Sequence, residues 1–147
     1  MTLNTDLEKA KQILKEKNCS CVFCRGNDVI IKTESGIAPL VGFTDSEIDY
    51  SDFCAADRII GKAAAFIYVL LNVKAVHGSV MSVSAVEILN HANIAYSYDV
   101  LADSIINRTG TGLCPMEDAV KDTDDPQTAL DLIKNKLSFL KKNLKIY

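Results

Sequence analysis

The chain has 147 residues, of which 48% are hydrophobic, 16 are Lys or Arg and 19 are Asp or Glu. This length and apolar content suit one domain, residues 1–147, with a core that needs neither disulfides nor metal. A net charge of −3 gives no basic field for nucleic acid, and the apolar runs are too short to cross a bilayer. The odd number of cysteines, five, is typical of reduced thiols, so we expect a cytoplasmic protein that binds neither nucleic acid nor membrane.

The N-terminal quarter predicts one helix and one hairpin. Thr5 followed by Glu8 forms a capping box ahead of apolar residues at helical spacing, which predicts an amphipathic helix over residues 3–17. Two β-rich runs, 19–24 and 29–33, are separated by a tight-turn composition. They predict two antiparallel strands, followed by a loop.

The middle of the chain is strongly apolar. The run DFCAADRIIGKAAAFIYVLL, residues 52–71, is apolar almost all round, which predicts a long central helix buried against a sheet. Residues 73–81 then predict a strand, residues 84–91 a helix opened by a capping box at Ser84, and residues 94–98 another strand. This β-α-β order makes the two strands parallel.

The C-terminal segment predicts a long helix that begins after Asp125-Pro126 and carries an apolar stripe. Its lysines are expected to form a solvated face, and its terminal Leu144, Ile146 and Tyr147 could contact another subunit of a homo-oligomer. The fold class expected from all the elements is α/β. It is a three-layer α-β-α sandwich whose mixed sheet has an N-terminal hairpin and parallel strands.

Three clustered cysteines, Cys19, Cys21 and Cys24, superficially suggest a zinc knuckle. On a strand, however, Cys19 and Cys21 face one way and Cys24 the other, so the three cannot converge. We therefore expect core thiols and no bound metal.

A first candidate site lies on the predicted central helix, where Cys54, Arg58 and Lys62 are spaced four residues apart and share a face with Asp57 beside them. A thiol in the first helical turn, close to two cations, would have a lowered pKa and could act as a nucleophile or join an anion site. The alternative is that Asp57 pairs with Arg58 or a neighbour, Lys62 extends its ammonium to the edge, and Cys54 only packs.

A second candidate site is INRTGTGLCPMED, residues 106–118, where a glycine-containing loop runs into a predicted helix with Cys114 as its N-cap. Free backbone N–H groups, an arginine and a helix N-terminus together predict a cradle for phosphate or carboxylate. The ligand-binding candidates of this segment are Asn107, Arg108, Thr109, Gly110, Thr111, Gly112 and Glu117.

The two histidines give less indication of a functional site. His77 ends an apolar strand segment and His91 lies at a helix C-terminus, and neither has a catalytic partner visible in the sequence. A Ser-His-Asp arrangement cannot be assembled from the sequence, so both are interpreted as structural.

The segments SDFCAADRIIGKAAA and INRTGTGLCPMED resemble a small prokaryotic family, domain of unknown function 1893, whose members are placed in the cytidine deaminase-like superfamily. The resemblance implies the cytidine deaminase fold, with a pocket at the start of the central helix. Cys54 would line this pocket and residues 107–114 would form its opposite wall.

Zinc deaminases carry a His-x-Glu or Cys-x-Glu motif on one helix and Pro-Cys-x-x-Cys at the start of a later one. Here Cys54 and Asp57 are three residues apart rather than two, and the later helix opens with Met81-Ser82-Val83-Ser84-Ala85, which contains no cysteine. Serine hydroxyls do not replace the thiolate pair. Because of this departure from the motif, we expect neither bound zinc nor ordinary zinc-dependent deamination.

Three functions stay open. The first is a module, without cofactor, that binds a small anionic or nucleotide-like ligand. The second is a metal-independent enzyme with Cys54 or Cys114 as nucleophile and Asp57 or Glu117 as acid or base. The third is a structural or oligomer-forming subunit.

Overall fold

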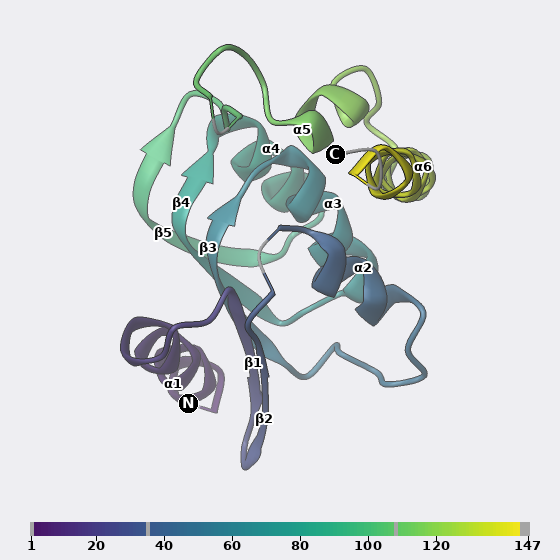
Figure 1. Cartoon of the computed structure of the whole chain (residues 1–147). Helices are drawn as coiled ribbons and strands as arrows, with labels where there is room; N and C mark the ends of the chain where they lie inside the picture. Colours follow the sequence, from purple (N-terminus) through teal and green to yellow (C-terminus); the bar gives the residue numbers. More distant parts are fainter. Residues whose placement is uncertain (1, 35, 108, 145–147) are drawn as a thin grey trace.

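The computed structural model describes residues 2–34, 36–107 and 109–144. Its strands are β1 (Cys21–Arg25), β2 (Asp28–Lys32), β3 (Cys54–Ile60), β4 (Ala75–Ser82) and β5 (Ala95–Ala102). Its helices are α1 (Thr2–Glu16), α2 (Ala38–Thr44), α3 (Lys62–Leu71), α4 (Val83–His91), α5 (Pro115–Val120) and α6 (Pro126–Leu144). The strands form one mixed sheet in the order β2-β1-β3-β4-β5, with helices on both of its faces (Figure 1).

The sheet has an antiparallel and a parallel half. β1 runs antiparallel to both β2 and β3, whereas β3, β4 and β5 are parallel. The predicted N-terminal hairpin and the predicted β-α-β unit, with α4 between β4 and β5, are both confirmed. The mixed α/β class is confirmed with them.

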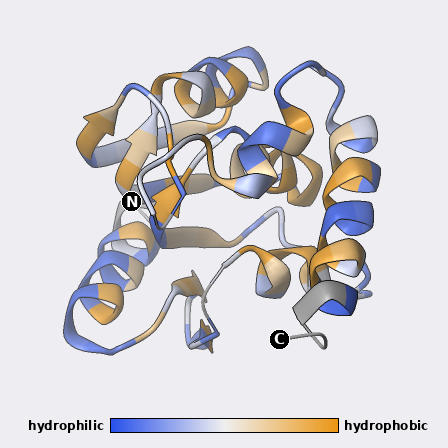
Figure 2. Ribbon diagram, turned by 45° about the horizontal axis from the view of Figure 1, so that its top comes forward, coloured by the Kyte–Doolittle hydropathy of each residue, from blue (hydrophilic) through white to orange (hydrophobic). Residues whose placement is uncertain are grey.

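The two faces of the sheet carry different cores. On one face, α1 places Ala10 and Leu14 against Val22, Cys24 and Ala56. On the other face lies a larger core that includes α2, α3, α4 and the inner sides of α5 and α6. In Figure 2 the helix that ends near the C-terminus, α6, alternates hydrophobic and hydrophilic turns, as expected of a helix with one buried face.

The long central helix predicted over residues 52–71 is wrong. Residues 54–60 form β3, Gly61 is the N-cap of the following helix, and only residues 62–71 are helical. The cause is that residues 54–57 of β3 are buried, and a strand segment covered on both faces shows the same continuous apolar pattern as a buried helix. Ala55 packs in the larger core and Ala56 packs under α1, one on each face.

Helix starts were predicted with mixed success. Asp125 caps α6 as expected, because its Oδ2 accepts a hydrogen bond from the Thr128 N–H at 2.9 Å. The cap of α4 is Ser82 rather than Ser84, since the Ser82 Oγ accepts from the Ala85 N–H at 3.1 Å. Thr5 lies inside α1, which already begins at Thr2.

Two further points concern helices. The expected loop after the hairpin contains α2, which has a proline in its first turn. Within the described residues, no helix has both the length and the apolar character needed to cross a membrane. Ile146 and Tyr147, expected to contact another subunit, lie outside the described part of the chain.

Candidate functional site

The residues of the first predicted site are divided between a strand and a helix. Cys54, Asp57 and Arg58 lie on β3, and Lys62 is the first residue of α3. The prediction that these residues share one face of a helix is therefore wrong. Cys54 is the first residue of β3, whereas α3 begins after the last residue of this strand. The thiol and the start of α3 therefore lie at opposite ends of β3.

The Cys54 thiol is fully buried next to Cys24, its direct partner across β1 and β3. Burial, with a smaller contribution from the charge of Asp6, raises the pKa of Cys54 to about 11. The lowered pKa expected for a thiol in a first helical turn is thus wrong, and the described surroundings hold Cys54 protonated at neutral pH.

Arg58 holds the end of α1 against the sheet. Its Nη2 donates hydrogen bonds to the carbonyls of Leu14 and Lys17, both at 3.0 Å, and its Nε donates to the carbonyl of Cys19. A cation at a helix C-terminus satisfies carbonyls that have no partner within the helix. The contacts of Arg58 therefore differ from the alternative in which Asp57 pairs with Arg58 itself.

Asp57 points into the larger core. Its Oδ2 accepts a hydrogen bond from the Tyr68 hydroxyl at 2.7 Å, and its Oδ1 accepts one from the Ile59 N–H at 3.4 Å. Burial raises the pKa of Asp57 to about 6, against the opposing effect of the Tyr68 hydrogen bond. This carboxyl is a core group that titrates near neutrality.

The start of α3 is occupied by a carboxylate of the chain itself. Glu117, on α5, is only 8% exposed; its Oε1 accepts from the Lys62 N–H at 2.7 Å and its Oε2 from the Ala63 N–H at 2.8 Å. Lys62 turns its ammonium to the Lys121 carbonyl at 3.1 Å. The second predicted segment does meet the start of α3, but its own Glu117 uses the N–H groups that an anion would need.

The loop before α5 is closed on itself. Ile106 and Leu113 form an antiparallel bridge, and the Asn107 Oδ1 accepts from the Thr111 N–H at 3.0 Å and the Thr109 hydroxyl at 3.1 Å. Gly110 turns the chain at a φ of +73°. These contacts differ from the open cradle that was expected.

The remaining candidates of this segment make backbone contacts. The Gly112 carbonyl accepts from the Asn107 N–H at 2.8 Å, and the Cys114 N–H donates to the Ile105 carbonyl at 3.0 Å. Cys114 is the N-cap of α5, as predicted, and is half-buried. Arg108 lies outside the described residues.

The cysteine cluster is likewise spread over two cores. Cys21 packs in the larger core, whereas Cys19 and Cys24 pack beneath α1, so Cys19 does not share the face of Cys21 as expected. Cys19 precedes β1, and the strand alternation does not extend to it. Within the described residues, no three His, Cys, Asp or Glu side chains are grouped so that they could hold a metal ion.

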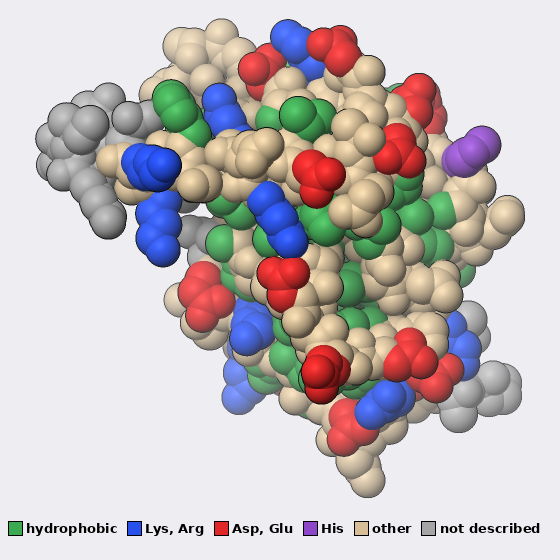
Figure 3. Space-filling model, turned by 90° about the vertical axis from the view of Figure 1, so that its right-hand side faces the viewer, with side chains coloured by type: hydrophobic (Ala, Val, Ile, Leu, Met, Phe, Trp, Pro, Cys, Tyr) green, Lys and Arg blue, Asp and Glu red, His purple; other side chains and the backbone are tan. Residues whose placement is uncertain are grey.

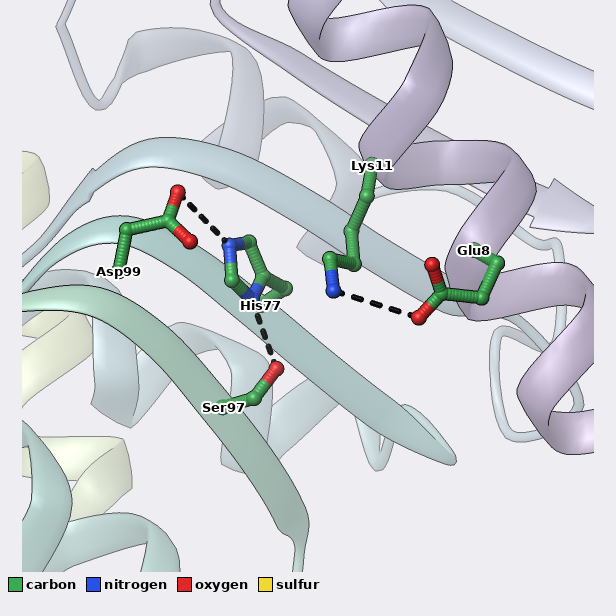
Figure 4. A network of polar contacts seen from close by, with 5 residues as sticks. All are labelled: Glu8, Lys11, His77, Ser97 and Asp99. Carbon is green, nitrogen blue, oxygen red and sulfur yellow. Dashed lines mark hydrogen bonds and ion pairs between the residues drawn. The ribbon is translucent and has the colours of Figure 1, made fainter.

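A polar group that the sequence did not indicate lies on the α1 side of the sheet. His77 on β4 is paired in register with Ser97 on β5, and Asp99 follows two residues later. The Nδ1 of His77 lies 2.7 Å from the Ser97 Oγ, and its Nε2 lies 3.3 Å from the Asp99 Oδ2 (Figure 4). Since an ionised carboxylate only accepts, Nε2 carries a proton, and the direction of the hydrogen bond between Nδ1 and the Ser97 hydroxyl depends on whether Nδ1 carries one too.

His77 is 4% exposed and is one of the residues that line a pocket of about 360 Å³ between α1 and the strands β3 to β5. The pocket is lined by Glu8, Lys11, Gln12, Leu14, Lys15, Arg58, His77, Ser79 and Asp99. Lys11 pairs with Glu8 at 3.2 Å, and Figure 4 shows this pair on α1 opposite the His77 group. Lys15 has no ion pair, and Ser79 no side-chain hydrogen bond, with any described residue.

The opposite side of the molecule offers a less specific hollow. A depression of about 570 Å³ lies between α2, the end of α3 and the start of α6, and Asp49 is the one charged residue in its lining. Figure 3, which looks onto the right-hand side of Figure 1, shows Lys or Arg interspersed with Asp or Glu. We therefore take the α1 pocket as the candidate site.

The fold and the site define an α/β protein with a mixed five-stranded sheet and a charged pocket beneath its N-terminal helix. Residues 9–137 match the family model described as domain of unknown function (DUF1893), and the chain belongs to this family. The crystal structure of a DUF1893 family protein, TM1506 from Thermotoga maritima, is similar to it, with 26% sequence identity and a TM-score of 0.81. That similarity covers 91% of this chain and 89% of the Thermotoga chain. Among curated proteins, none matches.

Proposed function

We propose that this DUF1893 protein binds a small anionic ligand in the pocket between α1 and the sheet. The observation that carries the proposal is the convergence of Lys15, Arg58 and His77 on one pocket. The lining contains three cationic side chains, those of Lys11, Lys15 and Arg58. It contains two carboxylates, those of Glu8 and Asp99. A pocket of about 360 Å³ is also within the size range of small-molecule sites.

Two groups of the pocket are available to a ligand. The Lys15 ammonium lacks an acidic partner and the Ser79 hydroxyl lacks a hydrogen-bond partner among the described residues, whereas Arg58 and Lys11 are already engaged. An ammonium and a hydroxyl beside an imidazole suit the oxygen atoms of a phosphate or carboxylate. Lys15 and Ser79 are therefore the proposed direct contacts.

The lining favours a compact anion over a nucleotide. None of the nine lining residues is Phe, Tyr or Trp, and the one ring among them, the His77 imidazole, is only 4% exposed, so the pocket offers little surface on which a base could stack. A phosphate ester or a small carboxylate fits the charges without a stacking surface. A nucleotide-like ligand would have to place its base outside the pocket.

We also infer that the protein derives from a cytidine deaminase-like ancestor that used zinc. The starts of α3 and α4, residues 61–64 and 81–85, support the loss of zinc, because they contain neither a His-x-Glu or Cys-x-Glu motif nor paired cysteines. The proposed binding site is then not the ancestral one. The start of α3 is capped by Glu117 of α5, whereas the proposed pocket lies under α1.

Thermal shift measurements test the proposal. Orthophosphate, glycerol phosphate and citrate should raise the melting temperature of the wild type, because a ligand that binds only the native state stabilises it. Lys15→Gln should reduce the shift, whereas Lys141→Gln, an exposed lysine on α6, should keep it. Equal shifts in both variants, or none in the wild type, would refute the proposed pocket.

A further inference from the structure

The edge strand β5 is unprotected. It is the last strand of the sheet, and its described backbone hydrogen bonds within the sheet go to β4 alone. Three of its eight residues are large and exposed apolar side chains: Tyr98 at 40%, Val100 at 55% and Leu101 at 47%. An open strand edge with apolar side chains is a template for pairing with another strand.

The other edge strand differs from β5 in its charges. β2 has a charged residue at each end, Asp28 and Lys32, within five residues. β5 has a single charged residue, Asp99, in eight, and it contains neither lysine nor proline. Since edge strands are normally blunted by such residues, β5 is the edge that the chain leaves available.

Val100 continues an apolar row across the sheet. It is paired in register with Val80 on β4, which is paired with Ile59 on β3. Directly paired residues lie side by side on one face, and Ile59 is 54% exposed. Ile106 and Leu113, at 59% and 39%, follow β5 along the chain and are also exposed.

We propose that the partner of β5 is the β5 strand of a second copy of this chain, paired antiparallel about a twofold axis at Val100. In that register Val100 lies opposite the same residue of the second copy, and the apolar row runs on through both sheets. Leu101 lies opposite Asp99, and Tyr98 lies opposite Ala102. The contact is isologous, and the two sheets become one.

The charge of β5 is compatible with this register and disfavours an axis at Asp99. If the axis passed through Asp99, two carboxylates would lie directly opposite each other, which is destabilising. With the axis at Val100, each Asp99 lies beside an uncharged residue, and β-branched side chains meet at the centre. The strand is thus complementary to itself in the register centred on Val100.

Light scattering coupled to gel filtration tests the assembly. The wild type should have twice the chain mass of 16.1 kDa at high concentration. Val100→Lys should have the mass of one chain, with an unchanged circular dichroism spectrum because Val100 is half-exposed. The matched variant Ile31→Lys, on the β2 edge and 41% exposed in the wild type, should remain dimeric.

A cross-link locates the axis independently. Val100→Cys should form a disulfide-linked dimer under a mild oxidant, because directly opposed residues of antiparallel strands lie within disulfide range. Ile31→Cys and the wild type should not. A monomeric wild type, a dimer that survives Val100→Lys, or a dimer lost in Ile31→Lys would each overturn the proposal.

Discussion

The carboxylate of Glu117 closes the start of α3 directly against Gly61, the N-cap residue. A Cβ atom at position 61 would come within 2.8 Å of the Glu117 Oε2, so the contact requires glycine. The same carboxylate accepts from the N–H groups of Lys62 and Ala63 at 2.7 and 2.8 Å. Through this contact α5 is attached to the start of α3, 55 residues earlier in the chain.

Replacing Glu117 should therefore destabilise the fold. Glu117→Ala leaves two helix N–H groups without their partner, and we expect a loss of about 2 kcal/mol in the free energy of unfolding. Asp118→Ala, next in sequence but 54% exposed and paired with Lys121, should cost little. Urea unfolding measures both, and equal losses would contradict the cap.

The buried carboxyl of Asp57 should make stability depend on pH. Its pKa is about 6 in the folded state against 3.8 in the unfolded chain. A raised folded pKa stabilises fully below the unfolded value, and this contribution is lost as the pH rises through about 6. The loss is on the order of 3 kcal/mol.

The variant Asp57→Asn isolates this effect. It removes the titrating proton while keeping an acceptor for the Tyr68 hydroxyl. The difference in unfolding free energy between wild type and variant, measured across a pH series, should favour the variant increasingly as the pH rises toward neutral. A difference that does not change with pH would contradict the raised pKa.

Arg58 should hold α1 on the sheet. Arg58→Lys keeps the charge but cannot donate to three carbonyls from one planar group, so the end of α1 should open more often. Hydrogen exchange of the last turn of α1 should accelerate, by about tenfold for each 1.4 kcal/mol lost. Arg25→Lys, which alters an exposed pair with Asp28, serves as the control and should leave α1 unchanged.

The cysteines should differ in reactivity. Cys114 is half-buried, while the other four are buried, and burial raises the pKa of Cys21 to about 12 and that of Cys54 to about 11. At neutral pH, iodoacetamide should modify Cys114 first and Cys54 only when the protein unfolds. Peptide mass spectrometry over time reads this order, and rapid labelling of Cys54 would revive its role as a nucleophile.

The parts of the fold that the sequence predicted have local signals. The hairpin has a tight turn, α6 has the Asp125-Pro126 start, and the β-α-β unit alternates visibly. β3 could not be separated from α3, since a strand buried on both faces has no polar alternation. The run is divided at Gly61, which follows the strand and is the N-cap of α3.

The candidate site was harder to predict because it depends on contacts distant in sequence. Glu117 was chosen as a candidate, yet its role as a helix cap needs the contact with α3. His77 was interpreted as structural because its partners, Ser97 and Asp99, are set by the register of β4 against β5. A serine and an aspartate two residues apart on a strand were the only hint.

The most direct test of the binding site is the imidazole signal of His77 during a titration with orthophosphate at constant pH and ionic strength. The chain has two histidines, so His91, exposed at the end of α4, serves as an internal reference. The account predicts a saturable shift of the His77 ring resonances, weakened in Lys15→Gln, while those of His91 stay unchanged. No shift at His77, or equal shifts at both histidines, would contradict it.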